Sequence, residues 1–78
     1  MKYKIKEICG GSIISLKLDK EINLKEVLKF FEGFEIVFES KDSLKVKKGN
    51  KEALIFSNGE IIFTNFDKNE IIEIAKKI

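Results

Sequence analysis

The chain has 78 residues, 36% of them charged, and a formal net charge of +2 at pH 7. This length predicts a single domain over residues 1–78 with one small core. The single cysteine, Cys9, excludes an internal disulfide, and the absence of histidine removes the commonest metal ligand and general base. No apolar run approaches the length of a membrane helix, so we expect a soluble, cytoplasmic protein.

The first residues predict strands. In "KYKIKEI", Tyr3 and Ile5 alternate with lysines, and Ile8 would regain the inner face only through a bulge. Gly10-Gly11 would close a tight turn. The next run, "SIISLKLD", has a clear apolar face made of Ile14, Leu16 and Leu18.

Two helices are predicted. In "NLKEVLKFFEG" the apolar residues recur at i, i+3, i+4 and i+7, which is typical of an amphipathic helix. Asn23 is a suitable N-cap, and Gly33 suits the position just past the helix end. The second helix is "DKNEIIEIAKKI", where Asp67 and Glu70 have the spacing of a capping box.

Four strand-like runs lie between the helices. In "FEIVFES", Phe34, Ile36 and Phe38 alternate with other residues and are expected to share one face. "DSLKVKK" follows, and then "EALIFSN" and "EIIFTN", which are joined at Asn58-Gly59. This dipeptide between apolar runs predicts a hairpin with a type I′ turn.

This order of elements predicts an α+β fold, a twisted antiparallel sheet of five or six strands with two helices packed on one face. Whether Met1–Cys9 adds a strand stays open. The predicted core consists of Ile14, Leu16, Leu18, Leu24, Val27, Leu28, Phe31, Leu44, Val46, Ile55, Ile61, Phe63, Ile71, Ile74 and Ile78. The other face of the sheet would then carry Leu54, Phe56, Ile62 and Thr64.

The C-terminal stretch "ALIFSNGEIIFTNFDKNEIIEIAKKI" resembles the second part of one repeat of the TATA-box-binding protein family. "IISLKLDKEINLKEV" is similar to the opening strand and first helix of that repeat. The resemblance covers most of the chain and implies a single TBP-like domain, half of the saddle that two repeats form. Single copies of this fold also occur as N-terminal domains of some DNA glycosylases and ribonucleases H.

The resemblance also implies site residues. Leu54, Phe56, Ile62 and Thr64 match positions that line the DNA face of the family, and Phe56 matches a phenylalanine that unstacks a base step. Lys45 matches a basic residue that reaches phosphate, and we expect Lys17 to add positive charge.

The chain departs from the family at three places. Gly11 aligns with the family's asparagine on the opening strand, and Glu60 stands where the family has a basic residue after the hairpin glycine. The family's second wedge aligns near Glu39 or Ser40, with Phe38 only nearby.

The sequence therefore predicts a non-enzymatic nucleic-acid-binding domain that uses the open face of a curved sheet, as a homodimer. Its partner would be double-stranded DNA, bound through the minor groove. The alternative is a protein–protein interaction module with the same fold and no DNA binding. We expect no catalytic residues, no metal site and no cofactor.

Overall fold

The structure is a computed structural model that describes residues 3–78, apart from the side chain of Cys9. In chain order the elements are β1 (Tyr3–Ile8), the 3-10 turn η1 (Cys9–Gly11), β2 (Ile13–Leu18), α1 (Leu24–Val27), the 3-10 segment η2 (Leu28–Phe31), β3 (Glu35–Glu39), β4 (Ser43–Lys48), β5 (Lys51–Phe56), β6 (Glu60–Thr64) and α2 (Lys68–Lys77).

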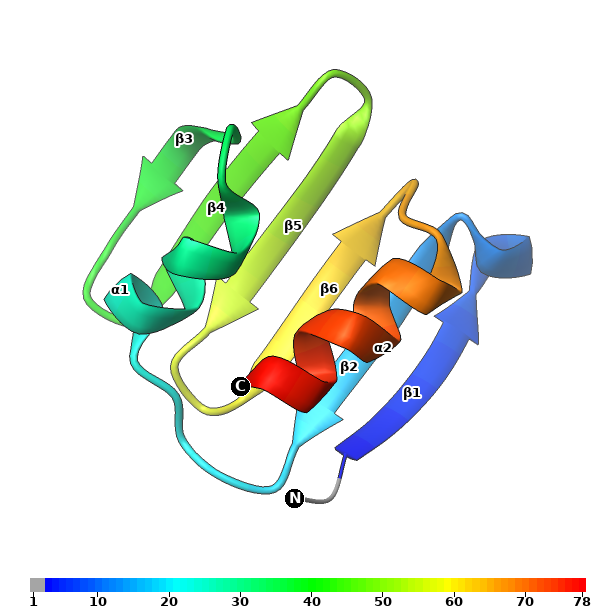
Figure 1. Cartoon of the computed structure of the whole chain (residues 1–78), viewed down its shortest axis with the longest axis horizontal. Coiled ribbons are helices and arrows are strands. Elements are labelled where there is room, and N and C mark those ends of the chain that lie inside the picture. Colours follow the sequence, from blue (N-terminus) through cyan, green and yellow to red (C-terminus); the bar gives the residue numbers. More distant parts are fainter. Residues whose placement is uncertain (1–2) are drawn as a thin grey trace.

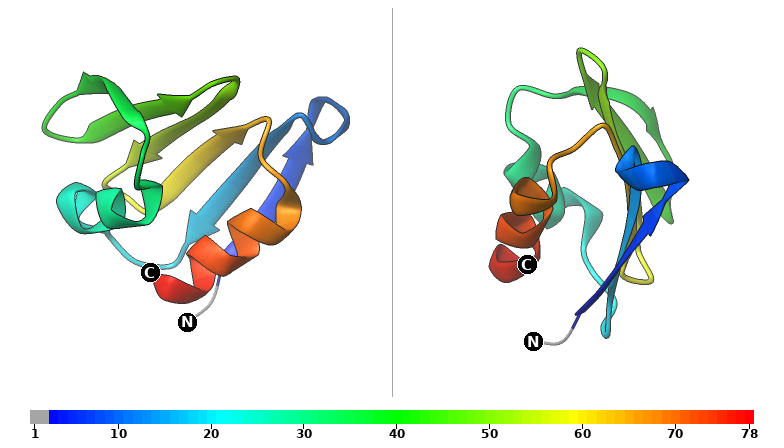
Figure 2. Two further views of the ribbon diagram at one scale, coloured as in Figure 1. Left: turned by 45° about the horizontal axis from the view of Figure 1, so that its top comes forward. Right: turned by 90° about the vertical axis from the view of Figure 1, so that its right-hand side faces the viewer.

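All six strands form one sheet in the order β1-β2-β6-β5-β4-β3, and every neighbouring pair is antiparallel (Figure 1). Both helical segments lie on the same side of this sheet, as the right-hand view of Figure 2 shows. The α+β prediction is confirmed, and β1 supplies the sixth strand.

The core lies between the sheet and the helices. Alternate residues of β2, β4, β5 and β6 point into it, because successive side chains of a strand point to opposite faces. Three residues of the predicted core, Leu24, Leu28 and Ile78, are only partly buried. Three residues outside that prediction are buried as well: Ala53, Phe66 and Ala75.

Aromatic rings fill the core beneath the helices. Phe31 stacks on Phe63, with ring centroids 6.2 Å apart, and Phe63 meets Phe66 edge to face at 4.9 Å. Phe34 in turn stacks on Phe66 at 5.8 Å. Large rings bury much apolar surface per residue, and so they suit a domain of this size.

The first hairpin differs from its prediction. The ladder between β1 and β2 runs without a shift from Tyr3 opposite Leu18 to Ile8 opposite Ile13. Because β1 has no bulge, strict alternation leaves Ile8 on the face of the sheet away from the helices, with 39% of its surface exposed.

The first helix begins where the sequence predicts, since the side chain of Asn23 accepts hydrogen bonds from the backbone N–H groups of Lys25 and Glu26. Its α-helical part has only four residues and continues as the 3-10 segment η2. Gly33 then takes a φ of 87°, the left-handed conformation expected just past a helix end.

The second helix is anchored at its N-terminus. Asp67 and Glu70 form the predicted capping box. Lys51 at the start of β5 donates to both carboxylate oxygens of Glu70, at 3.0 and 2.9 Å. Its ammonium also lies 5.5 Å from the centre of the Phe66 ring. These contacts fix α2 to the sheet.

The turn between β5 and β6 is not type I′, because only Gly59 has a positive φ, 102°. A type I′ turn requires positive φ at both central residues, Asn58 included. The loop is instead closed by a hydrogen bond from the N–H of Gly59 to the carbonyl of Phe56, 3.1 Å. Gly59 also packs against the backbone of Leu18 and Lys20, which leaves no room for a side chain.

Candidate functional site

The surface with the clearest pattern is the face of the sheet away from the helices, which we call the open face. Directly opposite residues of antiparallel strands share a face, so the register identifies its members. One row across the sheet runs from Lys45 on β4 through Leu54 on β5 and Ile62 on β6 to Ser15 on β2. The buried neighbours of these residues point to the helices.

The register brings all six candidate residues from the sequence to this face. Leu54 and Ile62 are direct partners at its centre, and Lys45 lies beside Leu54. The positions of the other three follow from the residues opposite them on neighbouring strands. Phe56 lies opposite Ser43, Thr64 opposite Glu52 and Ile13, and Lys17 opposite Glu60.

Apolar side chains cross the open face obliquely, from β1 to β5. Ile8 and Ile13 are partners at one end, Ile62 and Leu54 are partners in the next row, and Phe56 follows. We call these five residues the apolar diagonal. Ile8 and Ile13 were not among the candidate residues; Ile8 was left out because the expected bulge in β1 would have turned it to the core.

The open face carries a second phenylalanine that the sequence did not assign to it. The β3–β4 ladder shifts between Ile36, which lies opposite Val46, and Phe38, which lies opposite Lys45. Val37 is the extra residue of this bulge. Ile36 and Phe38 therefore lie on different faces, and the expectation that Phe34, Ile36 and Phe38 share one face is wrong.

Phe38 is the most exposed large apolar residue that the structure describes, with 52% of its surface exposed. It lies on the same face as Phe56, with β4 between their two strands. A bulge on an edge strand cannot be predicted reliably from a single sequence. The only signal here was the unbroken apolar run Ile36-Val37-Phe38, which alternation does not explain.

The charges on the open face are mixed. Lysines come from β1, β2 and β4, and carboxylates from β3, β5 and β6. The ammonium of Lys45 lies 3.2 Å from a carboxylate oxygen of Glu52. Glu60 accepts a hydrogen bond from the hydroxyl of Ser15 at 3.5 Å, and lies opposite Lys17. Within the described residues, the face lysines are Lys4, Lys6, Lys17, Lys45 and Lys47, and the face carboxylates are Glu35, Glu52 and Glu60.

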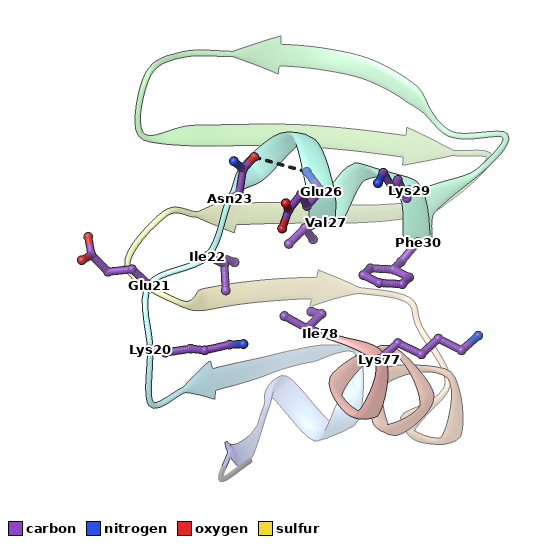
Figure 3. Close-up of a pocket in the computed structure, with 10 residues that line it drawn as sticks. All are labelled: Lys20, Glu21, Ile22, Asn23, Glu26, Val27, Lys29, Phe30, Lys77 and Ile78. Atoms are coloured by element: carbon purple, nitrogen blue, oxygen red, sulfur yellow. Dashed lines mark hydrogen bonds between the residues drawn. The ribbon is translucent and has the colours of Figure 1, made fainter.

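A groove of about 360 Å³ lies on the opposite side of the molecule, between the two helical segments. Figure 3 shows Ile22, Val27, Phe30 and Ile78 around this hollow, while Glu21 points away from it. Its rim carries the basic residues Lys20, Lys29 and Lys77 together with Glu26. Three lysines and one glutamate thus surround the apolar side chains of the groove.

Metal-binding clusters and buried polar side chains are absent from the side chains that the structure describes. Among these described side chains, no group of three or more acidic residues is arranged to hold a metal ion. The same residues include no buried polar or charged side chain. Neither helix in the described part of the chain is long and apolar enough to cross a membrane. The open face offers rings, aliphatic side chains, hydroxyls, lysines and carboxylates.

No protein-family model, curated protein or solved structure matches this chain.

Proposed function

We propose that the domain binds nucleic acid through the open face of its sheet. The observation that carries this proposal is the pair Phe38 and Phe56, two rings on one exposed sheet face with Lys45 between their strands. A base stacked on an aromatic side chain contributes about 1–3 kcal/mol, and lysines nearby neutralise phosphates.

The resemblance to the TATA-box-binding protein repeat supports the same proposal. That resemblance assigns Phe56 to a wedge position and finds no equivalent for the second wedge. Phe38 nevertheless supplies a second ring on the open face, since the bulge at Val37 turns it there. The surrounding hydroxyls of Ser15, Ser43 and Thr64 are groups that bind phosphate and sugar oxygens.

The test is fluorescence anisotropy with a labelled oligonucleotide at about 50 mM and about 200 mM salt. We expect binding that weakens with salt. Phe56→Ala should weaken it by about 1–3 kcal/mol, which is roughly 5- to 150-fold in Kd. Lys17→Ala should lower the slope of log K against log salt by about 1.

The matched control is Lys77→Ala, which removes the same charge from the helix side of the molecule. It should leave the slope near that of the wild type. Absence of binding at the lower salt concentration, or binding that is indifferent to Phe56, would rule out the proposal.

A protein partner is the second candidate, and one observation favours it. The carboxylates of Glu60 and of Glu52, which pairs with Lys45, place negative groups on the open face, and these groups repel phosphate. A protein that packs on the apolar diagonal would tolerate this mixture. Two results would support this candidate. The wild type would not bind oligonucleotides, and the Leu54→Lys variant would no longer bind the protein partner that the wild type binds.

The homodimer was predicted for the nucleic-acid-binding domain, and here we propose an arrangement of it that fits the second candidate instead. Pairing through β1 about a two-fold axis would bring Lys4 and Lys6 against lysines of the second copy. The bulge at Val37 interrupts the other edge, β3. A second copy would therefore pack on the open face, and sedimentation velocity of wild type and Leu54→Lys tests this arrangement.

A further inference from the structure

We propose that the ligand of the open face is a single strand of DNA or RNA and not a duplex. This inference rests on the nucleic-acid binding proposed above and names the class of nucleic acid. It depends on two features of the open face, the position of the two phenylalanine rings and the mixture of positive and negative charges around them.

Phe38 and Phe56 place two aromatic rings on one face of the sheet, where Phe38 is exposed and Phe56 is partly exposed. Stacking requires access to the face of a base. In a single strand the bases splay out and stack on aromatic side chains. In a duplex the base faces are covered by neighbouring base pairs, and a protein must first unstack a step before a ring can enter.

The spacing of the two rings suits separate bases. Phe38 is on β3 and Phe56 on β5, so one whole strand, β4, lies between them. Their partners Lys45 and Ser43 on β4 are two positions apart, so the rings are offset along the strands as well. Rings separated in this way would stack on different bases of a splayed strand, with Lys45 between them. They do not form a single wedge for one base step.

The charges of the open face do not provide what duplex distortion requires. Proteins that open a minor groove offset the cost of bending DNA with many extra contacts to the phosphates. Here the ammonium of Lys45 is paired with the carboxylate of Glu52, and Glu60 lies opposite Lys17, so fewer positive charges remain for phosphates. The chain also has no arginine, the side chain that best enters a narrow minor groove. A single strand needs no bending, so stacking adds directly to its affinity.

Lysine is concentrated at one side of the rings. Lys4, Lys6 and Lys17 lie on β1 and β2, and only Glu60 on β6 faces them. Ile62 and Leu54 lie between this basic side and Phe38. A single strand could place its phosphates along the lysines and turn its bases toward Phe56 and Phe38.

The experiment compares three labelled probes in anisotropy: an oligothymidine of about 12 nucleotides, an oligouridine of equal length, and the duplex of oligothymidine with its complement. We expect both single strands to bind at least about tenfold more tightly than the duplex. Phe38→Leu and Phe56→Leu should each weaken single-strand binding by roughly fivefold or more.

Ile36→Leu is the matched control, because Ile36 is an exposed apolar residue of the same strand on the opposite face. It should change the affinity less than twofold. Circular dichroism of each variant establishes that it folds, and Phe38 is exposed enough for its replacement to leave the core intact. Duplex binding that equals or exceeds single-strand binding would overturn this inference and leave the proposed function standing. Failure of all three probes to bind would overturn both.

Discussion

Phe38 lies directly opposite Lys45 across the β3–β4 ladder, whereas Ile36, two positions earlier, lies opposite Val46. In regular alternation these two residues of β3 would share a face. The extra residue, Val37, breaks the alternation and turns Phe38 away from the helices. With Val37 present, the placement of Phe38 on the open face thus depends on this bulge.

Deletion of Val37 should be tolerated. Without it, Ile36 and Phe38 become neighbours and still lie opposite Val46 and Lys45, so the ladder becomes regular and Phe38 stays on the open face. We expect a change in the free energy of unfolding within about 1 kcal/mol. Nuclear Overhauser contacts between Phe38 and Lys45 should persist in the deletion variant. Their loss in a folded variant would show that the register is set in another way.

Gly59→Ala should destabilise the domain strongly. A Cβ at this position would collide with the carbonyl oxygen of Lys20 and would lie 3.1 Å from the carbonyl oxygen of Leu18, in a backbone with φ of 102°. We expect a loss of roughly 2–3 kcal/mol or more in chemical denaturation. The control is Gly49→Ala, which has φ of 62° but nothing within 4 Å of the added Cβ. It should cost only about 1–2 kcal/mol. Equal losses in the two variants would contradict the packing of the β5–β6 turn on the β2–α1 connection.

Acid should weaken the attachment of α2. The hydrogen bond from Lys51 lowers the pKa of the Glu70 carboxyl below its ordinary value of 4.5. A carboxyl whose pKa is lower in the folded state contributes stability above pH 4.5, and this contribution is lost as the pH falls through the folded pKa. Both side chains are partly exposed, at 36% for Lys51 and 43% for Glu70, so the effect should be at most about 1 kcal/mol.

Glu70→Gln should remove this part of the pH dependence when denaturation is followed from pH 6 to pH 3. Glu73→Gln, on the exposed side of the same helix, serves as the control and should follow the wild type. A Glu70→Gln curve parallel to that of the wild type at every pH would contradict the role given to the ion pair.

Buried and open-face phenylalanines should respond differently to truncation. Phe63 is fully buried and contacts the rings of Phe31 and Phe66. Phe63→Ala should therefore cost about 3–5 kcal/mol, which is enough to unfold much of a domain of this size at room temperature. Phe38→Ala should change stability by only about 0.5 kcal/mol. Thermal unfolding of the two variants side by side measures the difference, and a large loss from Phe38→Ala would mean that this ring is packed.

The sequence predicted the parts of the fold that local pattern determines. The apolar stripe of α2 and the alternation of apolar and polar residues in β2, β4, β5 and β6 identified the faces that point into the core. Asn23 and Asp67 correctly indicated where the two helices begin. Leu54, Phe56 and Ile62 were assigned to the correct face for the same reason, since alternation in a regular ladder leaves only two choices.

The errors arose where tertiary contacts override local pattern. The bulge at Val37 depends on how β3 fits the edge of β4, which neither strand encodes alone. The turn at Gly59 is fixed by its approach to Lys20, a residue distant in sequence, and so Asn58-Gly59 did not adopt the turn that this dipeptide favours. Phe66 was missed because it lies in a short connection, where neither helical nor strand periodicity applies.

The most direct test of the central claim is a heteronuclear NMR titration of the labelled protein with an oligothymidine of about 12 nucleotides. If the open face binds nucleic acid, the largest changes should fall on the ring signals of Phe38 and Phe56 and on the side chains of Leu54 and Ile62. The signals of Phe30 and Ile78, which line the groove between the helices, should stay nearly unchanged. Changes centred on that groove, or no changes at millimolar oligonucleotide, would contradict the account.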